Sequence, residues 1–428
     1  MKKYRILIWF PYKFDYYIGI FKSLNRRDDT ECRDKSDFGF ETDYYSQKDY
    51  EKIQADFHAN IILLYQITKR ELFIDISDNV IVWSYMDDVF GKYVMVGKDY
   101  FRNFPQKNYL YLPVLDEKAF DLDGVMETME LKKKTTMAPF VPFCAVDNNV
   151  ISDSVKEKYA CDIALILYKR RIGDASCRRM AGINNNNALA KDAMQMLGLL
   201  YVAMRKEILE QEHIVVDVEW IERLLIRYFD QYNIWQYARN REELLERWKR
   251  LSLYVINVNL YGEIIADWLI ERDYNLKLYG GWEEKKYRKY SMGYLREGSK
   301  SVQYANCMAK IGINTNPMIA IHRRTLDYMS AGTMCLSAGA GTRNFDAKAN
   351  FSHYSHFFED KKSIVMFYNK KELYDNIDFY LSHTERREEI AMAGKSIISE
   401  RKLDYQNVVN QAFNELIDRM ENNGDKVV

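Results

Sequence analysis

Short apolar runs alternate with amphipathic stretches along the first third of the chain. The apolar runs are Ile6–Phe10, Ile61–Tyr65, Val80–Tyr85 and Tyr109–Leu115. Their lengths are those of buried strands. Between the first two runs, Asp49–Ala59 has the spacing of an amphipathic helix. Strands separated by helices are typical of βαβ units, so we expect a first α/β domain with a parallel sheet over residues 1–150.

The same alternation returns in the second part of the chain, after a basic run and two prolines at 132–142. Strands are expected at Asp162–Tyr168, Tyr254–Val258, Leu276–Tyr279, Ala309–Asn314 and Met334–Ser337. A helix is expected over Ile264–Arg272. These elements predict a second α/β domain over residues 151–395.

Two further helical patterns complete the expected organisation. Apolar residues from Leu189 to Ile208, and again from Trp220 to Phe229, recur at helical spacing. They predict a helical insertion in the second domain, over about residues 180–250. The tail from Glu385 to about Met420 is also helical in pattern, and we expect residues 396–428 to form a C-terminal helix that packs back on the N-terminal domain.

Composition narrows the class of protein. The chain has 428 residues, 47% of them hydrophobic, which fits two globular domains. Lys and Arg total 62, and so do Asp and Glu. This balance argues against a nucleic-acid partner, which usually selects a basic excess. Six scattered cysteines without a C-x-x-C pair, and no apolar run of about 18–20 residues, predict a cytoplasmic protein without a transmembrane segment.

One segment departs from the charge balance. Lys285–Arg324 contains nine basic residues and one acidic residue. It leads into a predicted helix from about Arg323 to Gly332. Guanidinium and backbone N–H groups at a helix N-terminus form an anion site suited to a diphosphate, and Asp327 is placed to accept hydrogen bonds from a ribose. For the lysines alone, a solvated basic surface is the better interpretation.

Other chemistries lack their motifs. His353 and His356 form an H-x-x-H without a third ligand, and Asp121 and Asp123 form a D-x-D in a polar segment that does not follow a clear strand. No G-x-x-x-x-G-K-[ST] or G-x-S-x-G sequence is present. We therefore expect no metal and no cofactor.

The second half resembles a known family. The segments that carry the resemblance are Leu276–Trp282 (LKLYGGW), Gly293–Leu295 (GYL), Tyr304–Asn314 (YANCMAKIGIN), Arg324–Asp327 (RTLD), Ser330–Gly332 (SAG) and Tyr380–Gly394. In this order they are similar to glycosyltransferases with two Rossmann-like domains facing a central cleft, the GT-B fold, and most of all to the bacterial spore-maturation (CgeB-like) branch. The similarity covers about residues 275–400.

The resemblance implies a nucleotide-sugar donor bound by the second domain. Arg324 falls on the family's diphosphate-side arginine, next to Arg323 and His322, and Asp327 takes the place of a ribose-binding glutamate. The other residues expected near the donor are Tyr304, Gly280, Gly281 and Trp282. Arg170 and Arg171, after the first strand of the second domain, are expected to bind the diphosphate, with a solvated loop as the alternative. One departure is Ile319, where many related retaining enzymes carry an acidic residue.

These observations predict a metal-independent glycosyltransferase whose donor is a nucleotide-diphosphate sugar, first of all a UDP-sugar, and whose acceptor is a glycan or a protein. Fixed cations would stabilise the departing diphosphate. Asp87 and Asp88, after a first-domain strand, are the candidate catalytic bases of an inverting reaction, although a turn or helix-capping pair is the alternative. Because of Ile319, a non-catalytic nucleotide-binding or scaffold subunit of the same fold stays open, as does a nucleotide-sugar epimerase.

Overall fold

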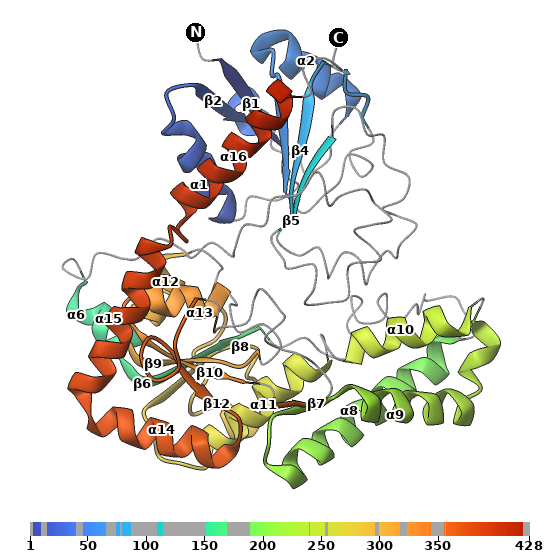
Figure 1. Ribbon diagram of the computed structural model, residues 1–428, viewed down its shortest axis with the longest axis vertical. Helices are drawn as coiled ribbons and strands as arrows, with labels where there is room; N and C mark the ends of the chain where they lie inside the picture. Colours follow the sequence, from blue (N-terminus) through green and yellow to red (C-terminus); the bar gives the residue numbers. More distant parts are fainter. Residues whose placement is uncertain are drawn as a thin grey trace. The chain divides into compact units, whose positions relative to one another are not determined.

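The computed structural model describes residues 3–9, 15–39, 46–65, 74–77, 79–86, 109–113, 151–168, 189–238, 240–252, 256–295, 299–316, 323–339, 341–343, 355 and 357–422. The chain divides into two compact units (Figure 1). Unit 1 contains Met1–Tyr93, Gly97–Cys144 and Ser399–Val428, and unit 2 contains Val94–Val96 and Ala145–Ile398. The two ends of the chain therefore belong to the same unit.

Unit 1 is built on a parallel sheet of five strands in the order β2-β1-β3-β4-β5. The strands are β1 (Tyr4–Trp9), β2 (Thr30–Asp34), β3 (Ile61–Tyr65), β4 (Ile81–Met86) and β5 (Tyr109–Pro113). The helices are α1 (Asp15–Asn25), η1 (Lys35–Phe38), α2 (Gln47–Phe57) and α16 (Tyr405–Asn422). Helix α2 begins where the sequence supplies a capping box, because Ser46 and Asp49 satisfy each other's backbone N–H groups.

The C-terminal helix α16 is part of the core of unit 1. Its apolar residues Val409, Phe413 and Leu416 lie in one buried cluster with β1, β3 and α1. The Phe413 ring meets Tyr4 edge to face at 5.5 Å between ring centroids. Gln406 of α16 donates a hydrogen bond to the Ser23 carbonyl at 3.1 Å. The sheet of unit 1 is thus covered on one face by α1 and α16 together.

Unit 2 repeats the same strand order. Its five parallel strands follow the order β12-β10-β9-β6-β8. They are β6 (Cys161–Leu167), β8 (Leu276–Gly280), β9 (Ala309–Asn314), β10 (Met334–Ala338) and β12 (Val365–Phe367). Numbered within each unit, both sheets have the order 2-1-3-4-5, in which the direction of chain progression reverses beside the first strand.

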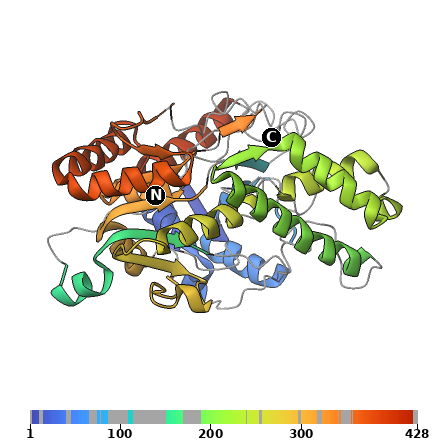
Figure 2. The ribbon, with the colours of Figure 1, turned by 90° about the horizontal axis from the view of Figure 1, so that it is seen from below.

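Helices flank this second sheet. They are α6 (Asp153–Tyr159), α8 (Leu189–Gln211), α9 (Val218–Gln231), η6 (Ile234–Tyr237), α10 (Arg241–Leu251), α11 (Asn257–Ile270), η8 (Lys285–Tyr287), α12 (Lys300–Cys307), α13 (Arg323–Ser330), α14 (Lys370–Ser382) and α15 (Thr384–Glu400). Helices α8, α9 and α10 form a block to one side of the sheet, as both Figure 1 and Figure 2 show. Next to this block, β7 (Val215–Asp217) pairs with β11 (Gly341–Arg343).

The expected α/β class, with two parallel-sheet domains, is confirmed. The strand predicted at Tyr254–Val258 is wrong for its last two residues, which form the first turn of α11. Their apolar run continues at helical spacing through Leu260 and Ile264, so the helix prevails over a short strand. The predicted continuous tail helix is interrupted at residues 401–404, where Lys402 has a φ of 55°.

Candidate functional site

The candidate site lies at the carboxyl ends of the strands of unit 2. In this sheet the reversal of direction falls between β6 and β9, which pair from Cys161 to Leu165. Open parallel sheets bind ligands in the crevice outside such a point, because the loops that leave the two strands diverge there. The residues that follow β6 and β9 are therefore the first candidates for ligand contacts.

Two glycines bring the backbone close together at this edge. Gly280, the last residue of β8, has a φ of 123°, and a Cβ there would lie 1.9 Å from the Leu167 carbonyl oxygen. Gly262 of α11 is similarly close, since its Cβ would lie 2.1 Å from Leu167 Cδ2. Glycine is required at position 280, where φ is positive and a backbone oxygen blocks any Cβ, whereas the atom close to Gly262 is the end of the Leu167 side chain. Strand β8 therefore approaches the backbone at the end of β6, and helix α11 packs on its last side chain.

A buried hydroxyl without a partner faces the same place. Thr315 directly follows β9, its side chain is 2% exposed, and its Oγ1 would lie 3.5 Å from a Cβ on Gly262. Among the residues that the structure describes, Thr315 Oγ1 has no hydrogen-bond partner. Its neighbour Asn314 is satisfied, donating to Ser337 Oγ at 2.9 Å. Buried hydroxyls are normally paired, so this exception makes Thr315 a candidate for a ligand contact.

Helix α13 packs on the face of the sheet opposite to α11. Its Tyr328 ring lies over Gly312, where a Cβ would be 2.2 Å from Tyr328 Cδ1, and the Tyr328 hydroxyl donates to the Ala164 carbonyl at 3.2 Å. These two contacts of Tyr328 fix the position of α13 against β6 and β9. The first turn of α13, which carries the half-buried Arg324, follows the loop that leaves the carboxyl end of β9. Asp327, one turn later, is buried, with 6% of its surface exposed.

An aromatic pair lies at the end of β6. Tyr168 follows this strand, and its ring stacks on Tyr294 with 6.3 Å between centroids and an interplanar angle of 15°. The Tyr168 hydroxyl donates to the Leu295 carbonyl at 2.6 Å. Tyr294 is 63% exposed. From the sequence, Tyr168 was expected only as the end of a strand, and Tyr294 only as part of the GYL segment. An exposed ring held by a second ring offers a flat surface on which a planar ligand group can stack.

Two aromatic residues expected near the donor contact other aromatic rings. Trp282 is fully buried, its indole N–H donates to the Tyr279 carbonyl at 3.2 Å, and it meets Tyr287 edge to face. It therefore supports the turn after Gly280 and Gly281 from inside, and its buried ring has no surface for a ligand. Tyr304, on α12, contacts the Tyr159 ring at 5.7 Å.

A polar network anchors the segment after β8. Asp267 of α11 accepts hydrogen bonds from Arg205 of α8 at 2.5 Å, from Tyr287 at 2.7 Å, and from Lys286. Burial works to raise the pKa of the Asp267 carboxyl, but these three hydrogen bonds outweigh it and hold the pKa below its ordinary value. Two helices and the turn that supports Gly280 are thus tied to one carboxylate.

The basic segment does not form a single cationic surface. Three of its lysines pair with aspartates: Lys286 with Asp267, Lys289 with Asp273, and Lys310 with Asp162. Lys310 and Asp162 are the second residues of β9 and β6, so this pair lies at the amino ends of the strands, opposite to the candidate site. The excess of positive charge in the sequence is therefore divided between the two edges of the sheet.

Several predicted site residues lie outside the described residues: Asp87, Asp88, Arg170, Arg171 and His322. Arg323 is described only as the first residue of α13. Among the described residues, no group of three or more His, Cys, Asp or Glu side chains is arranged to hold a metal ion. Within the same residues, every helix is too short or too polar to cross a bilayer.

Comparison with known proteins gives one sequence match. Residues 239–414 match the family model of glycosyl transferase-like proteins. This span contains β8, β9 and α13, and therefore much of the candidate site. No curated protein matches the chain.

Three solved structures are similar in layout. HepE of Anabaena in complex with UDP-glucose has 10% identity, covers 97% of this chain and 99% of its own, and gives a TM-score of 0.46. Sucrose-phosphate synthase of Thermosynechococcus elongatus has 9% identity, with coverage of 87% and 76% and a TM-score of 0.42. UDP-GlcNAc 2-epimerase of Neisseria meningitidis bound to UDP-GlcNAc has 8% identity, with coverage of 97% and 100% and a TM-score of 0.40.

Proposed function

We propose that this protein is a glycosyltransferase of the GT-B type that uses a nucleotide-diphosphate sugar, with UDP-sugars as the first donors to test, and a glycan or protein as the acceptor. The observation that carries the proposal is the match of residues 239–414 to glycosyl transferase-like proteins, because the matched span contains β9 and α13, which form one side of the switch point of unit 2. We further propose that the CgeB-like branch is its nearest family.

The donor is proposed to bind outside the carboxyl ends of β6 and β9. The nucleoside would stack on the exposed Tyr294 ring, and the diphosphate would face the first turn of α13, where Arg324 and the positive end of the helix dipole favour negative charge. Asp327 is proposed to bind the ribose. Thr315 Oγ1 would donate to an oxygen of the bound donor, which would give this hydroxyl the partner that it lacks among the described residues.

The proposed reaction breaks the bond between the sugar C1 and the β-phosphate oxygen and forms a bond between C1 and the acceptor oxygen. The electron pair leaves on the diphosphate, so the stabilising groups must face that oxygen as its charge grows. The acceptor hydroxyl loses its proton to a base. In an inverting reaction we propose Asp87 or Asp88 for this role. The proposed chemistry needs no metal, because Arg324 and the helix dipole provide the positive field.

The cytoplasm is the proposed compartment. Four cysteines of the described residues, Cys32, Cys161, Cys307 and Cys335, are free. Burial raises the pKa of the Cys161 and Cys335 thiols to about 12, so both stay protonated and unreactive at neutral pH. Free, inert thiols in the core are expected of a protein that folds in a reducing environment.

The test is a thermal-shift screen with UDP, UDP-glucose and UDP-GlcNAc, followed by a search for donor hydrolysis. A ligand that binds only the folded state raises the melting temperature. We expect a shift with UDP and with at least one UDP-sugar, and slow release of UDP from that sugar. A well-folded protein that shows no shift with any of the three would favour the scaffold alternative. Epimerised donor without transfer or hydrolysis would favour the epimerase.

A further inference from the structure

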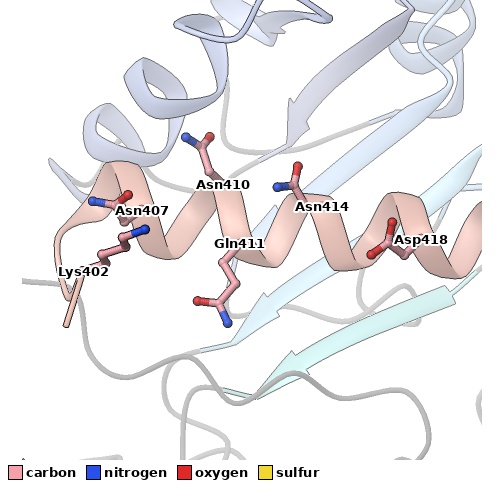
Figure 3. A pocket seen from close by; sticks show the side chains of 6 residues that line it. All are labelled: Lys402, Asn407, Asn410, Gln411, Asn414 and Asp418. Atoms are coloured by element: carbon pink, nitrogen blue, oxygen red, sulfur yellow. The ribbon is translucent and has the colours of Figure 1, made fainter. Parts of the chain in front are cut away.

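A cavity of about 480 Å³ lies against the C-terminal helix α16 of unit 1. The described residues that line it are Lys402, Asn407, Asn410, Gln411, Asn414 and Asp418, which Figure 3 shows along the helix and the turn before it. Its volume is within the range of small-molecule sites. All six of these residues belong to unit 1, whereas the residues of the candidate site belong to unit 2.

The lining follows from the periodicity of the helix. The apolar positions of α16 that enter the core, such as Val409 and Phe413, recur three and four residues apart. The cavity residues Asn407, Asn410 and Asn414 recur at the same spacing on the other side of the helix. The core of unit 1 therefore fixes the direction in which this polar face points. Such a face is a preformed surface rather than a set of independent loop residues.

This face is rich in carboxamides and has no net charge. Four of the six lining residues carry carboxamides, each of which offers both donors and an acceptor. The formal charges of Lys402 and Asp418 cancel. By contrast, the preceding helix α15 begins with the charged sequence TERREE and exposes most of these residues. Helix faces that are only solvated usually carry charged side chains, as α15 does. The neutral amide face of α16 therefore needs another explanation.

One carboxamide lacks a partner and another is held in place. Asn410 Oδ1 is buried, yet it accepts no hydrogen bond among the described residues. Asn407, in contrast, is held by Asp404, which accepts from its backbone N–H at 3.0 Å and from its Nδ2 at 2.6 Å. The cavity thus combines an unsatisfied acceptor with a fixed amide, as expected of a site that completes its hydrogen bonds with a ligand.

From these observations we infer that the α16 cavity binds a neutral saccharide. Sugar hydroxyls both donate and accept, as carboxamides do, and a ring of this kind would give Asn410 Oδ1 its missing donor. A phosphate or a nucleotide would instead require an excess of positive charge, which the lining lacks. This inference does not rest on the proposed transferase activity, since every residue that carries it lies in unit 1.

The experiment is a calorimetric titration of the full chain with maltotriose and with chitotriose, and with inorganic phosphate as the anionic comparison. We expect one of the two trisaccharides to bind and phosphate not to bind. Asn410→Leu, which keeps the volume but removes the amide, and Asn414→Ala, on the exposed part of the same face, should each weaken binding by about 3–10-fold, the effect of one hydrogen bond. Gln236→Leu, an exposed amide in unit 2, is the matched control and should bind as the wild type does.

Three results would overturn the inference. They are no binding of either trisaccharide, binding of phosphate but of neither sugar, and sugar binding that neither cavity variant changes. If Asn410→Leu does not fold, the titration of Asn414→Ala decides alone, because that side chain is exposed and contributes little to the core. A failure of UDP binding would leave this result untouched, so the two proposals fail separately.

Discussion

Replacing Thr315 by valine should change the stability of the protein and its affinity for the donor in opposite directions. The two side chains have nearly the same shape, so the change removes a hydroxyl and leaves the packing against Gly262 and Leu167 intact. A buried hydroxyl without a partner costs about 1–3 kcal/mol of stability. Removing it should therefore stabilise unit 2 by about 1 kcal/mol, after allowing for some relaxation of the site. For a domain of this size, that is a rise in Tm of about 2–4 °C.

The matched control is Thr333→Val. This threonine is also buried, at 3% exposure, but its hydroxyl donates to the Asn306 carbonyl at 2.6 Å. The same substitution should here destabilise the protein by about 1–2 kcal/mol, because it removes a hydrogen bond and leaves a buried carbonyl with one partner fewer. If the two Thr→Val substitutions change the free energy of unfolding in opposite directions, the difference lies in the hydrogen-bond partners of the two hydroxyls.

The assay combines urea unfolding with titration of the same samples with UDP-glucose. Thr315→Val should be at least as stable as the wild type and should bind the donor about 3–10-fold more weakly. A Thr315→Val protein that is destabilised as strongly as Thr333→Val would refute the reasoning, since the hydroxyl would then have a structural partner. Unchanged donor affinity in a stabilised variant would remove Thr315 from the proposed site.

Three further predictions test the surroundings of the site. Gly312→Ala, whose Cβ would lie 2.2 Å from the Tyr328 ring, should destabilise the protein by about 1–3 kcal/mol and weaken donor binding, whereas Gly198→Ala, with open space around it, should stabilise by up to about 1 kcal/mol in urea unfolding. Burial raises the pKa of Tyr261 and Tyr328, so these tyrosines lose their protons at a lower pH in the unfolded state than in the folded state. Their contribution to the free energy of unfolding is therefore fully present below pH about 10 and should fall as the pH rises further. A urea midpoint that does not change from pH 8 to 11 would contradict this. Asp267→Asn should cost about 1–3 kcal/mol and lower Tm, because two cations and a tyrosine lose their shared carboxylate; an unchanged Tm would mean that the network carries no stability.

The sequence predicts the strands of the fold well where they are long and apolar. Ile61–Tyr65 and Ala309–Asn314 appear with the expected bounds, because strands buried over most of their length leave an unambiguous apolar pattern. Strands β2 (TECRD) and β12 (VMF) were not expected, since the first is largely polar and the second has three residues. Pairing with a neighbouring strand, and not local preference, makes them strands.

The site was less predictable than the fold. The motif around Arg324 and Asp327 predicts a helix that the structure has at Arg323–Ser330, because the signal lies in consecutive residues. Thr315 and the Tyr168–Tyr294 pair could not be found in this way, since their roles depend on contacts between segments far apart in the chain. The charge of the Lys285–Arg324 segment was misleading for the same reason, as Lys310 lies at the other edge of the sheet.

The central claim is that the first turn of α13 holds the diphosphate of a nucleotide sugar, and titration of Arg324→Ala with UDP tests it most directly. Loss of a charged hydrogen bond of about 1.5–3 kcal/mol predicts an affinity about 10–150-fold lower than that of the wild type, with an unchanged circular dichroism spectrum. Arg223→Ala, an exposed arginine of α9, is the control and should bind UDP as the wild type does. Equal affinity of Arg324→Ala and the wild type for UDP, or no binding of UDP to the folded wild type, would contradict the claim.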